Sequence, residues 1–94
     1  MRSNATNQQL TEQKEVVPND YIVIVHTESQ EIVNTVPHTK AELKRAIDAC
    51  QTQDVPWDVF TGGFSFSLSV DNEMKDYDER EPYFRIDPEK DYNI

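Results

Sequence analysis

Two runs of β-forming residues joined by Gly62-Gly63 occupy the tract 55–70. Gly-Gly is a favoured two-residue hairpin turn because both positions tolerate positive φ. The tract therefore predicts an antiparallel hairpin whose register is fixed by its turn. In this register Thr61 lies opposite Phe64, Val59 opposite Phe66, Trp57 opposite Leu68 and Val55 opposite Val70.

The side chains of the predicted hairpin separate into an apolar face and a polar face. Directly opposed residues of an antiparallel pair point to the same face. One face therefore carries Val55, Trp57, Val59, Phe64, Phe66, Leu68 and Val70. The other face carries Asp58, Ser65, Ser67 and Ser69, with Pro56 and Phe60 as exceptions. A slip of one residue would remove this agreement between two strands, which favours the hairpin.

Further strands are predicted on both sides of the hairpin. Residues 21–27 form a run of β-forming residues that is typical of a central strand buried on both faces. Residues 31–36 are predicted to be the antiparallel partner of that strand and to end before Pro37. Residues 83–86 are a candidate for a short additional strand.

A helix is predicted to begin at Thr39. The pattern fits a capping box, in which the threonine hydroxyl accepts the N–H of Glu42 and the Glu42 side chain reaches back. An apolar stripe follows at the spacing i, i+3, i+4 and i+7, formed by Leu43, Ala46, Ile47 and Cys50. The helix should end near Thr52, before Pro56.

These elements predict an α+β fold in which a small antiparallel sheet packs against one helix. The order is ββαββ, with residues 83–86 as the candidate fifth strand. The helix stripe should cover the face that bears Trp57, Phe64, Phe66 and Leu68. A chain of 94 residues forms one domain at most. Residues 1–15 are polar and are predicted to be a flexible or partner-ordered arm, and residues 16–94 a single small domain with an acidic C-terminal region.

The strong acidity of the chain limits its partners. Its formal net charge is -9, from 18 Asp and Glu against 9 Lys and Arg. Residues 71–94 contain nine acids and four bases and so contribute -5 of that charge. A negative field disfavours direct binding to nucleic acid and to anionic membranes. The charge therefore predicts a protein partner with a basic surface.

The cysteine content and the absence of long apolar runs bear on the compartment. The single cysteine, Cys50, cannot form an internal disulfide, which is typical of a reducing compartment. No apolar run has the length of a signal peptide or of a membrane span. We therefore expect a cytoplasmic protein, or one of the host cytoplasm if the chain is viral.

Few residues offer catalytic or metal-binding chemistry. Cys50 with either His26 or His38 could form a nucleophile and its base. A metal site could use Cys50, both histidines and a carboxylate. None of them has the spacing of a C-x-x-C or H-E-x-x-H motif, and Cys50 lies on the apolar stripe. The segment 71–79 is rich in oxygen ligands but lacks the glycine and the spacing of a calcium loop. We expect no catalytic site, no metal and no cofactor.

The acidic residues after position 70 are the candidates for partner binding. Many recur two positions apart, and in extended backbone such positions lie roughly 6.5 Å apart, which is of the order of the phosphate spacing along a nucleic-acid strand. Interleaved tyrosines suit a binding surface. Such an array could imitate nucleic acid in the basic groove of a nucleic-acid-handling protein. The candidate residues are Asp71, Glu73, Asp76, Tyr77, Asp78, Glu79, Glu81, Tyr83, Asp87, Glu89 and Asp91.

Together these features predict a non-enzymatic acidic protein-binding module, with an inhibitor of phage-accessory or nucleic-acid-mimic type as one form of it. In small size, acidity, single cysteine and lack of catalytic motifs the chain is similar in type to phage-encoded accessory proteins and host-defence inhibitors. That resemblance includes no specific motif. Two alternatives stay open. One is a structural subunit of a larger assembly, and the other is a small enzyme that uses Cys50 and a histidine.

Overall fold

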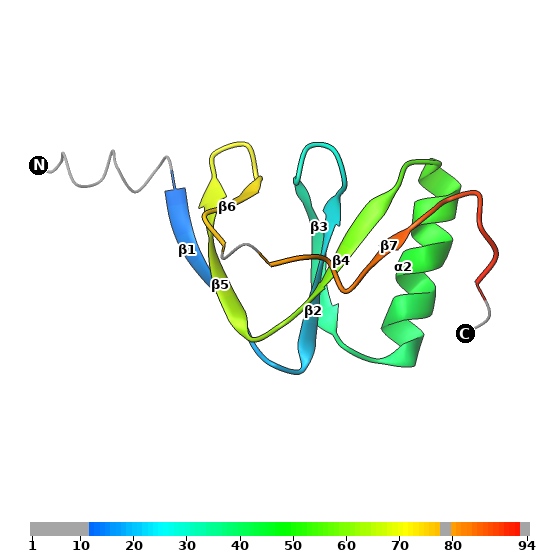
Figure 1. The fold of residues 1–94 in the computed structure, drawn as a ribbon, viewed down its shortest axis with the longest axis horizontal. Helices are drawn as coiled ribbons and strands as arrows, with labels where there is room; N and C mark the ends of the chain where they lie inside the picture. Colours follow the sequence, from blue (N-terminus) through cyan, green and yellow to red (C-terminus); the bar gives the residue numbers. More distant parts are fainter. Residues whose placement is uncertain (1–11, 78–79, 93–94) are drawn as a thin grey trace, which may run out of the picture.

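Two antiparallel sheets and one helix make up the computed structural model, which describes residues 12–77 and 80–92 (Figure 1). The first sheet has the order β1-β5-β6 and contains β1 (Glu12–Val17), β5 (Phe64–Ser69) and β6 (Met74–Lys75). The second sheet has the order β3-β2-β4-β7 and contains β2 (Tyr21–His26), β3 (Ile32–Pro37), β4 (Trp57–Thr61) and β7 (Phe84–Ile86). The helix α2 (Lys40–Gln53) connects β3 to β4. The predicted α+β class is confirmed.

Several elements form where their local sequence predicts them. β2 is a central strand between β3 and β4, and its residues 22–25 are all buried. β3 is its antiparallel partner, and β7 adds a short strand to the far side of β4. Thr39 caps α2 by accepting the N–H of Glu42 at 3.1 Å. The Glu42 carboxylate does not reach back, because it accepts from the guanidinium of Arg45 at 3.1 Å.

The predicted hairpin at Gly62-Gly63 is not formed. β4 pairs with β2 and β7 in the second sheet, whereas β5 pairs with β1 and β6 in the first. Thr61 lies opposite Ile22 instead of Phe64, and Phe64 lies opposite Val17. The two glycines therefore pass the chain from one sheet to the other. Residues 57–60 of β4 are all buried, because each face of this strand packs against a core. The apolar alternation of the two runs therefore does not tell whether they pair with each other.

A second crossing lies beside this one and explains why glycine is needed. The segment between β1 and β2 also passes between the sheets, so β1-β2 and β4-β5 form one long antiparallel ribbon with a sharp corner (Figure 1). At the corner Gly62 N–H donates to Tyr21 O and Gly63 N–H to Val17 O, each at 2.8 Å. A Cβ atom at Gly62 would lie 1.8 Å from the carbonyl oxygen of Pro18. The corner thus depends on close approach of two backbones.

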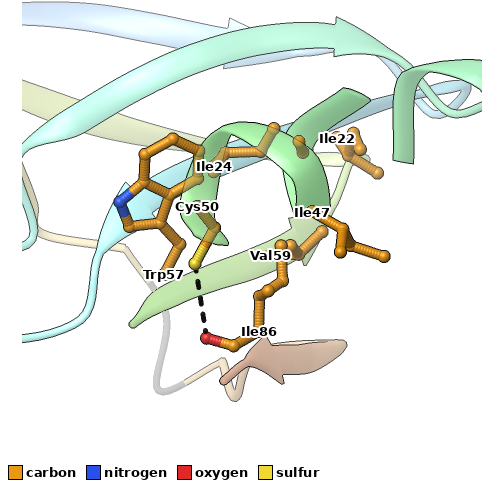
Figure 2. Close-up of a cluster of buried hydrophobic side chains, with 8 residues drawn as sticks. Ile22, Ile24, Ile47, Cys50, Trp57, Val59 and Ile86 are labelled. Carbon is orange, nitrogen blue, oxygen red and sulfur yellow. Dashed lines mark hydrogen bonds between the residues drawn. The ribbon is translucent and has the colours of Figure 1, made fainter. Parts of the chain in front are cut away.

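Separate apolar clusters cover the two faces of the second sheet. The helix-side core lies between this sheet and α2 and contains Ile22, Ile24, Ala46, Ile47, Cys50, Trp57, Val59 and Ile86 (Figure 2). The inter-sheet core lies between the two sheets and contains Val17, Val23, Val25, Phe60, Phe64, Phe66 and Met74. Neighbouring residues of a strand point to opposite faces, so β2 and β4 contribute to both cores.

The division into two cores corrects one prediction about the helix. Trp57 does pack beneath the apolar stripe of α2, as expected. Phe64, Phe66 and Leu68 do not, because the corner carries β5 away from the helix and into the first sheet. Phe60, an exception on the polar face of the predicted hairpin, is only 2% exposed in the inter-sheet core.

The first described strand overlaps the predicted N-terminal arm. β1 begins at Glu12, so residues 12–15 pair with β5 as part of the first sheet, whereas residues 1–11 of the predicted arm lie outside the described residues. Strand pairing uses backbone hydrogen bonds and does not require apolar side chains. Across the described ranges, no helix combines the length and the apolar character needed to span a membrane.

Candidate functional site

Turns from both sheets meet at one end of the molecule. The turn between β2 and β3 contacts the segment before β4, where Thr27 N–H donates to Pro56 O at 3.3 Å. The same turn contacts the first sheet, where Met74 N–H donates to Gln30 O at 2.9 Å. The residues after β7 and Pro56 line the same hollow of about 430 Å³ and so lie near each other. Four connecting segments that are distant in sequence therefore lie in a row at this end, each beside the next.

Carboxylates gather on these four segments. The turn between β2 and β3 and the turn between β5 and β6 each supply two, and so do the residues after β7, while the C-terminus of α2 supplies one. We call this set the acidic end: Glu28, Glu31, Asp54, Asp71, Glu73, Asp87 and Glu89. All are exposed except Glu73, which is half-buried. Their summed field favours a cationic partner.

Two nearby basic side chains, Lys75 and Arg85, are engaged by individual carboxylates, whereas Lys90 Nζ lies 5.8 Å from the centroid of the Tyr92 ring. Lys75 Nζ lies 3.3 Å from Glu73 Oε1. Arg85 Nε lies 2.7 Å from Oδ1 of Asp58. The side chain of Asp58 is 5% exposed, and its carboxylate also accepts from Thr27 Oγ1. The hydrogen bond to Asp58, together with the charge of Asp58, raises the pKa of Arg85, so the guanidinium stays charged. Arg85 thus balances a buried acid that is not part of the acidic end.

The helix contributes to the same field. α2 ends at its C-cap residue Asp54, which has a left-handed conformation with φ 61° and donates its N–H to Cys50 O at 2.9 Å. The last turn of the helix contains no basic residue. The negative end of the helix dipole is therefore directed toward the acidic end without a compensating side chain on α2.

The structure places some of the candidate residues from the sequence at the acidic end and others outside it. Asp71, Glu73, Asp87 and Glu89 belong to the acidic end. Asp76 is exposed just after β6, Glu81 is exposed before β7, and Asp91 is exposed two residues beyond Glu89. Asp78 and Glu79 lie outside the described residues. Tyr83 is 56% exposed and packs edge-on against His38, near the corner and away from the acidic end.

Tyr77 makes internal contacts. Its ring packs edge-on against Phe60 with 5.6 Å between the ring centroids, and its hydroxyl donates to Gln30 Oε1 at 2.7 Å. Burial raises the pKa of Tyr77, and the charge of Asp58 acts in the same direction. Tyr77 therefore ties the inter-sheet core to the turn between β2 and β3.

Replacing Tyr77 with phenylalanine should lower the free energy of unfolding by about 1 kcal/mol at neutral pH, because the hydrogen bond to Gln30 is lost. In the unfolded chain the phenol ionises near pH 10.0, below the raised pKa of the folded state. Wild type should therefore lose stability above that pH, and its advantage over the variant should shrink. Urea unfolding at neutral pH and at about pH 11 measures both effects. An advantage that is constant with pH would contradict this assignment.

The regular spacing proposed for a nucleic-acid mimic does not form in the described residues. Asn72, between Asp71 and Glu73, has φ 67°, and Asp76 has φ 54°. Asp87 O accepts the N–H of Lys90 at 3.1 Å, which closes a turn. An extended backbone has negative φ throughout, so these acids are not an evenly spaced row.

Cys50 is a core residue, as its place on the helix stripe predicts. Its side chain is fully buried, and its thiol donates to Val55 O at 2.9 Å and approaches Ile86 O at 3.7 Å (Figure 2). Burial raises the pKa of the thiol; a hydrogen bond to the Trp57 backbone opposes this and the charge of Asp87 adds to it. His26 packs against Trp57 and His38 against Tyr83, and no hydrogen bond joins either histidine to Cys50 among the described residues. Nor does any group of three or more potential ligands among them fit a metal ion.

Sequence reasoning did not single out three members of the acidic end: Glu28, Glu31 and Asp54. They lie in turns far from the acidic region after position 70 and come near it only through the pairing of the strands. These three acids follow the end of a predicted strand or helix. Their position would have indicated a shared surface only if the pairing of β2 with β4 had been known.

Comparisons of the chain with protein-family models, with curated proteins and with solved structures find no match. The candidate site therefore rests on the geometry and charge of the described residues.

Proposed function

We propose that this protein is a non-enzymatic binding module that engages a basic surface of a partner protein through its acidic end. An inhibitor that blocks such a surface is the form of this function that we favour. The observation that carries the proposal is the gathering of carboxylates from four separate chain segments at one end of the fold.

Charge of this kind acts mainly on association. A concentrated negative field steers a basic partner toward the site and raises the association rate, and the effect weakens with ionic strength. Acids spread evenly over the surface would give solubility without directing a partner. The proposal therefore requires the position of the charges to matter as well as their number.

Two variants with the same net charge distinguish the effect of where the acidic charges lie from the effect of how many there are. In the first, three members of the acidic end become amides: Glu28→Gln, Asp54→Asn and Asp71→Asn. In the second, three exposed acids elsewhere change in the same way: Asp20→Asn, Asp48→Asn and Glu81→Gln. Asparagine tolerates the left-handed backbone of Asp54, so both variants should fold.

Affinity capture from an extract of the source cells tests the proposal. We expect a basic protein to be retained by wild type and by the second variant, and to be lost by the first. Its retention should fall between about 50 mM and about 500 mM salt, because screening is then nearly complete over a few ångströms. Equal retention by both variants, or retention that salt does not change, would contradict the proposal.

A further inference from the structure

A hollow of about 280 Å³ opens at the acidic end, between the turn that follows β2 and the segment that precedes β4. His26, Val55 and Pro56 line it together with Thr27, Ser29 and two glutamates, and Val55 is 38% exposed. The hydrogen bond from Thr27 N–H to Pro56 O holds the two sides together. The hollow therefore has a partly apolar lining, and a backbone hydrogen bond joins its two sides.

The rim of the hollow is negative. Glu28 and Glu31 line it, both are exposed, and neither is in an ion pair with a described residue. No lysine or arginine lines the hollow. A hollow that is lined by apolar residues and by two carboxylates without an ion pair to a described residue is complementary to a side chain with an apolar stem and a cationic head.

We propose that this hollow receives an arginine side chain of the basic partner, an inference that rests on the proposed function and names the group that is recognised. The stem would lie along Val55 and Pro56, and the guanidinium would donate to Glu28 and Glu31. Arginine fits better than lysine because its planar, weakly hydrated guanidinium stacks on flat rings and binds carboxylates in a forked geometry. An ammonium group keeps its hydration more strongly and has no flat face for the ring of His26.

Binding of nona-arginine and nona-lysine peptides to the full chain tests the inference. The test variant is Glu28→Gln with Glu31→Gln, and the matched control is Asp71→Asn with Asp76→Asn. All four residues are exposed and outside the observed ion pairs, and each variant loses two charges. Trp57, the single tryptophan, is a convenient fluorescence reporter because its ring lies 5.9 Å from that of His26.

We expect wild type to bind nona-arginine about tenfold more tightly than nona-lysine, a difference of about 1.4 kcal/mol. The test variant should lose this preference, whereas the control should keep it and should weaken both peptides alike. Loss of preference in both variants, or no preference in wild type, would overturn the arginine assignment. Equal weakening of both peptides by both variants would also overturn it, while leaving the proposed function intact.

Discussion

Replacing Trp57 with alanine should lower the free energy of unfolding by about 3–5 kcal/mol, the range measured when large buried aromatic side chains are truncated. Trp57 is 2% exposed and lies in the helix-side core against residues of α2 (Figure 2). A domain this small is only marginally stable. We therefore expect the alanine variant to be largely unfolded, as measured by circular dichroism and by urea titration.

The loss should extend to both cores. Trp57 begins β4, where it pairs with His26 on one side and with Ile86 on the other. The same strand carries Phe60 into the inter-sheet core. When β4 detaches, the second sheet is divided and neither core keeps its central strand. Unfolding should thus be a single cooperative transition for signals from both cores.

A phenylalanine at the same position is the control. The indole N–H of Trp57 is buried and has no hydrogen-bond partner among the described residues. Its removal recovers a desolvation penalty of about 1–3 kcal/mol, which offsets part of the packing lost with the smaller ring. Trp57→Phe should therefore be far milder than Trp57→Ala. Similar losses in the two variants, or a stable alanine variant, would show that this core is assigned wrongly.

Local patterns in the sequence were sufficient for the helix and for the central strand. The capping threonine fixes where α2 begins, and the apolar stripe fixes which face is buried. Both signals act within a few residues, so no knowledge of the distant chain is needed. The uninterrupted apolar run of β2 likewise requires two buried faces, whatever covers them.

Strand pairing could not be derived in the same way. The tract around Gly62-Gly63 satisfies the hairpin pattern, yet its two strands belong to different sheets. Trp57, Val59 and the two phenylalanines of β5 are buried in the corner, as the hairpin also requires, so their burial does not tell which strands are neighbours. Val55 and Val70, which the hairpin places on its apolar face, are exposed. Phe60 was the discordant observation, because a hairpin with one solvated face leaves it exposed.

Only part of the acidic end could be predicted from the sequence, because its other members depend on strand pairing. Asp71 and Glu73 were predicted as candidates because they belong to a region of the sequence that is dense in acidic residues. Glu28 and Glu31 join them because the two turns are hydrogen-bonded to each other, as in the bond from Ile32 N–H to Asn72 O at 2.9 Å. Local charge density identifies part of such a surface, and the fold supplies the rest.

Replacing Gly62 with alanine should lower the free energy of unfolding by about 3–5 kcal/mol. The new Cβ would lie 1.8 Å from Pro18 O and 2.8 Å from Tyr21 O, so the backbones at the corner must separate. Separation loses the hydrogen bonds from Gly62 to Tyr21 and from Gly63 to Val17, worth about 0.5–1.5 kcal/mol each. Overpacking of a tight contact costs about 1–3 kcal/mol more.

The matched variant Gly63→Ala distinguishes the corner from a hairpin turn. Gly63 has φ 88°, so alanine there costs about 1–2 kcal/mol for its left-handed backbone. Its Cβ would meet only the side-chain oxygen of Asn19, which can move away. A type I′ Gly-Gly turn needs positive φ at both positions and would make the two substitutions similarly costly. Urea unfolding should therefore give a larger loss for Gly62→Ala than for Gly63→Ala, and equal losses would restore the hairpin that the sequence predicts.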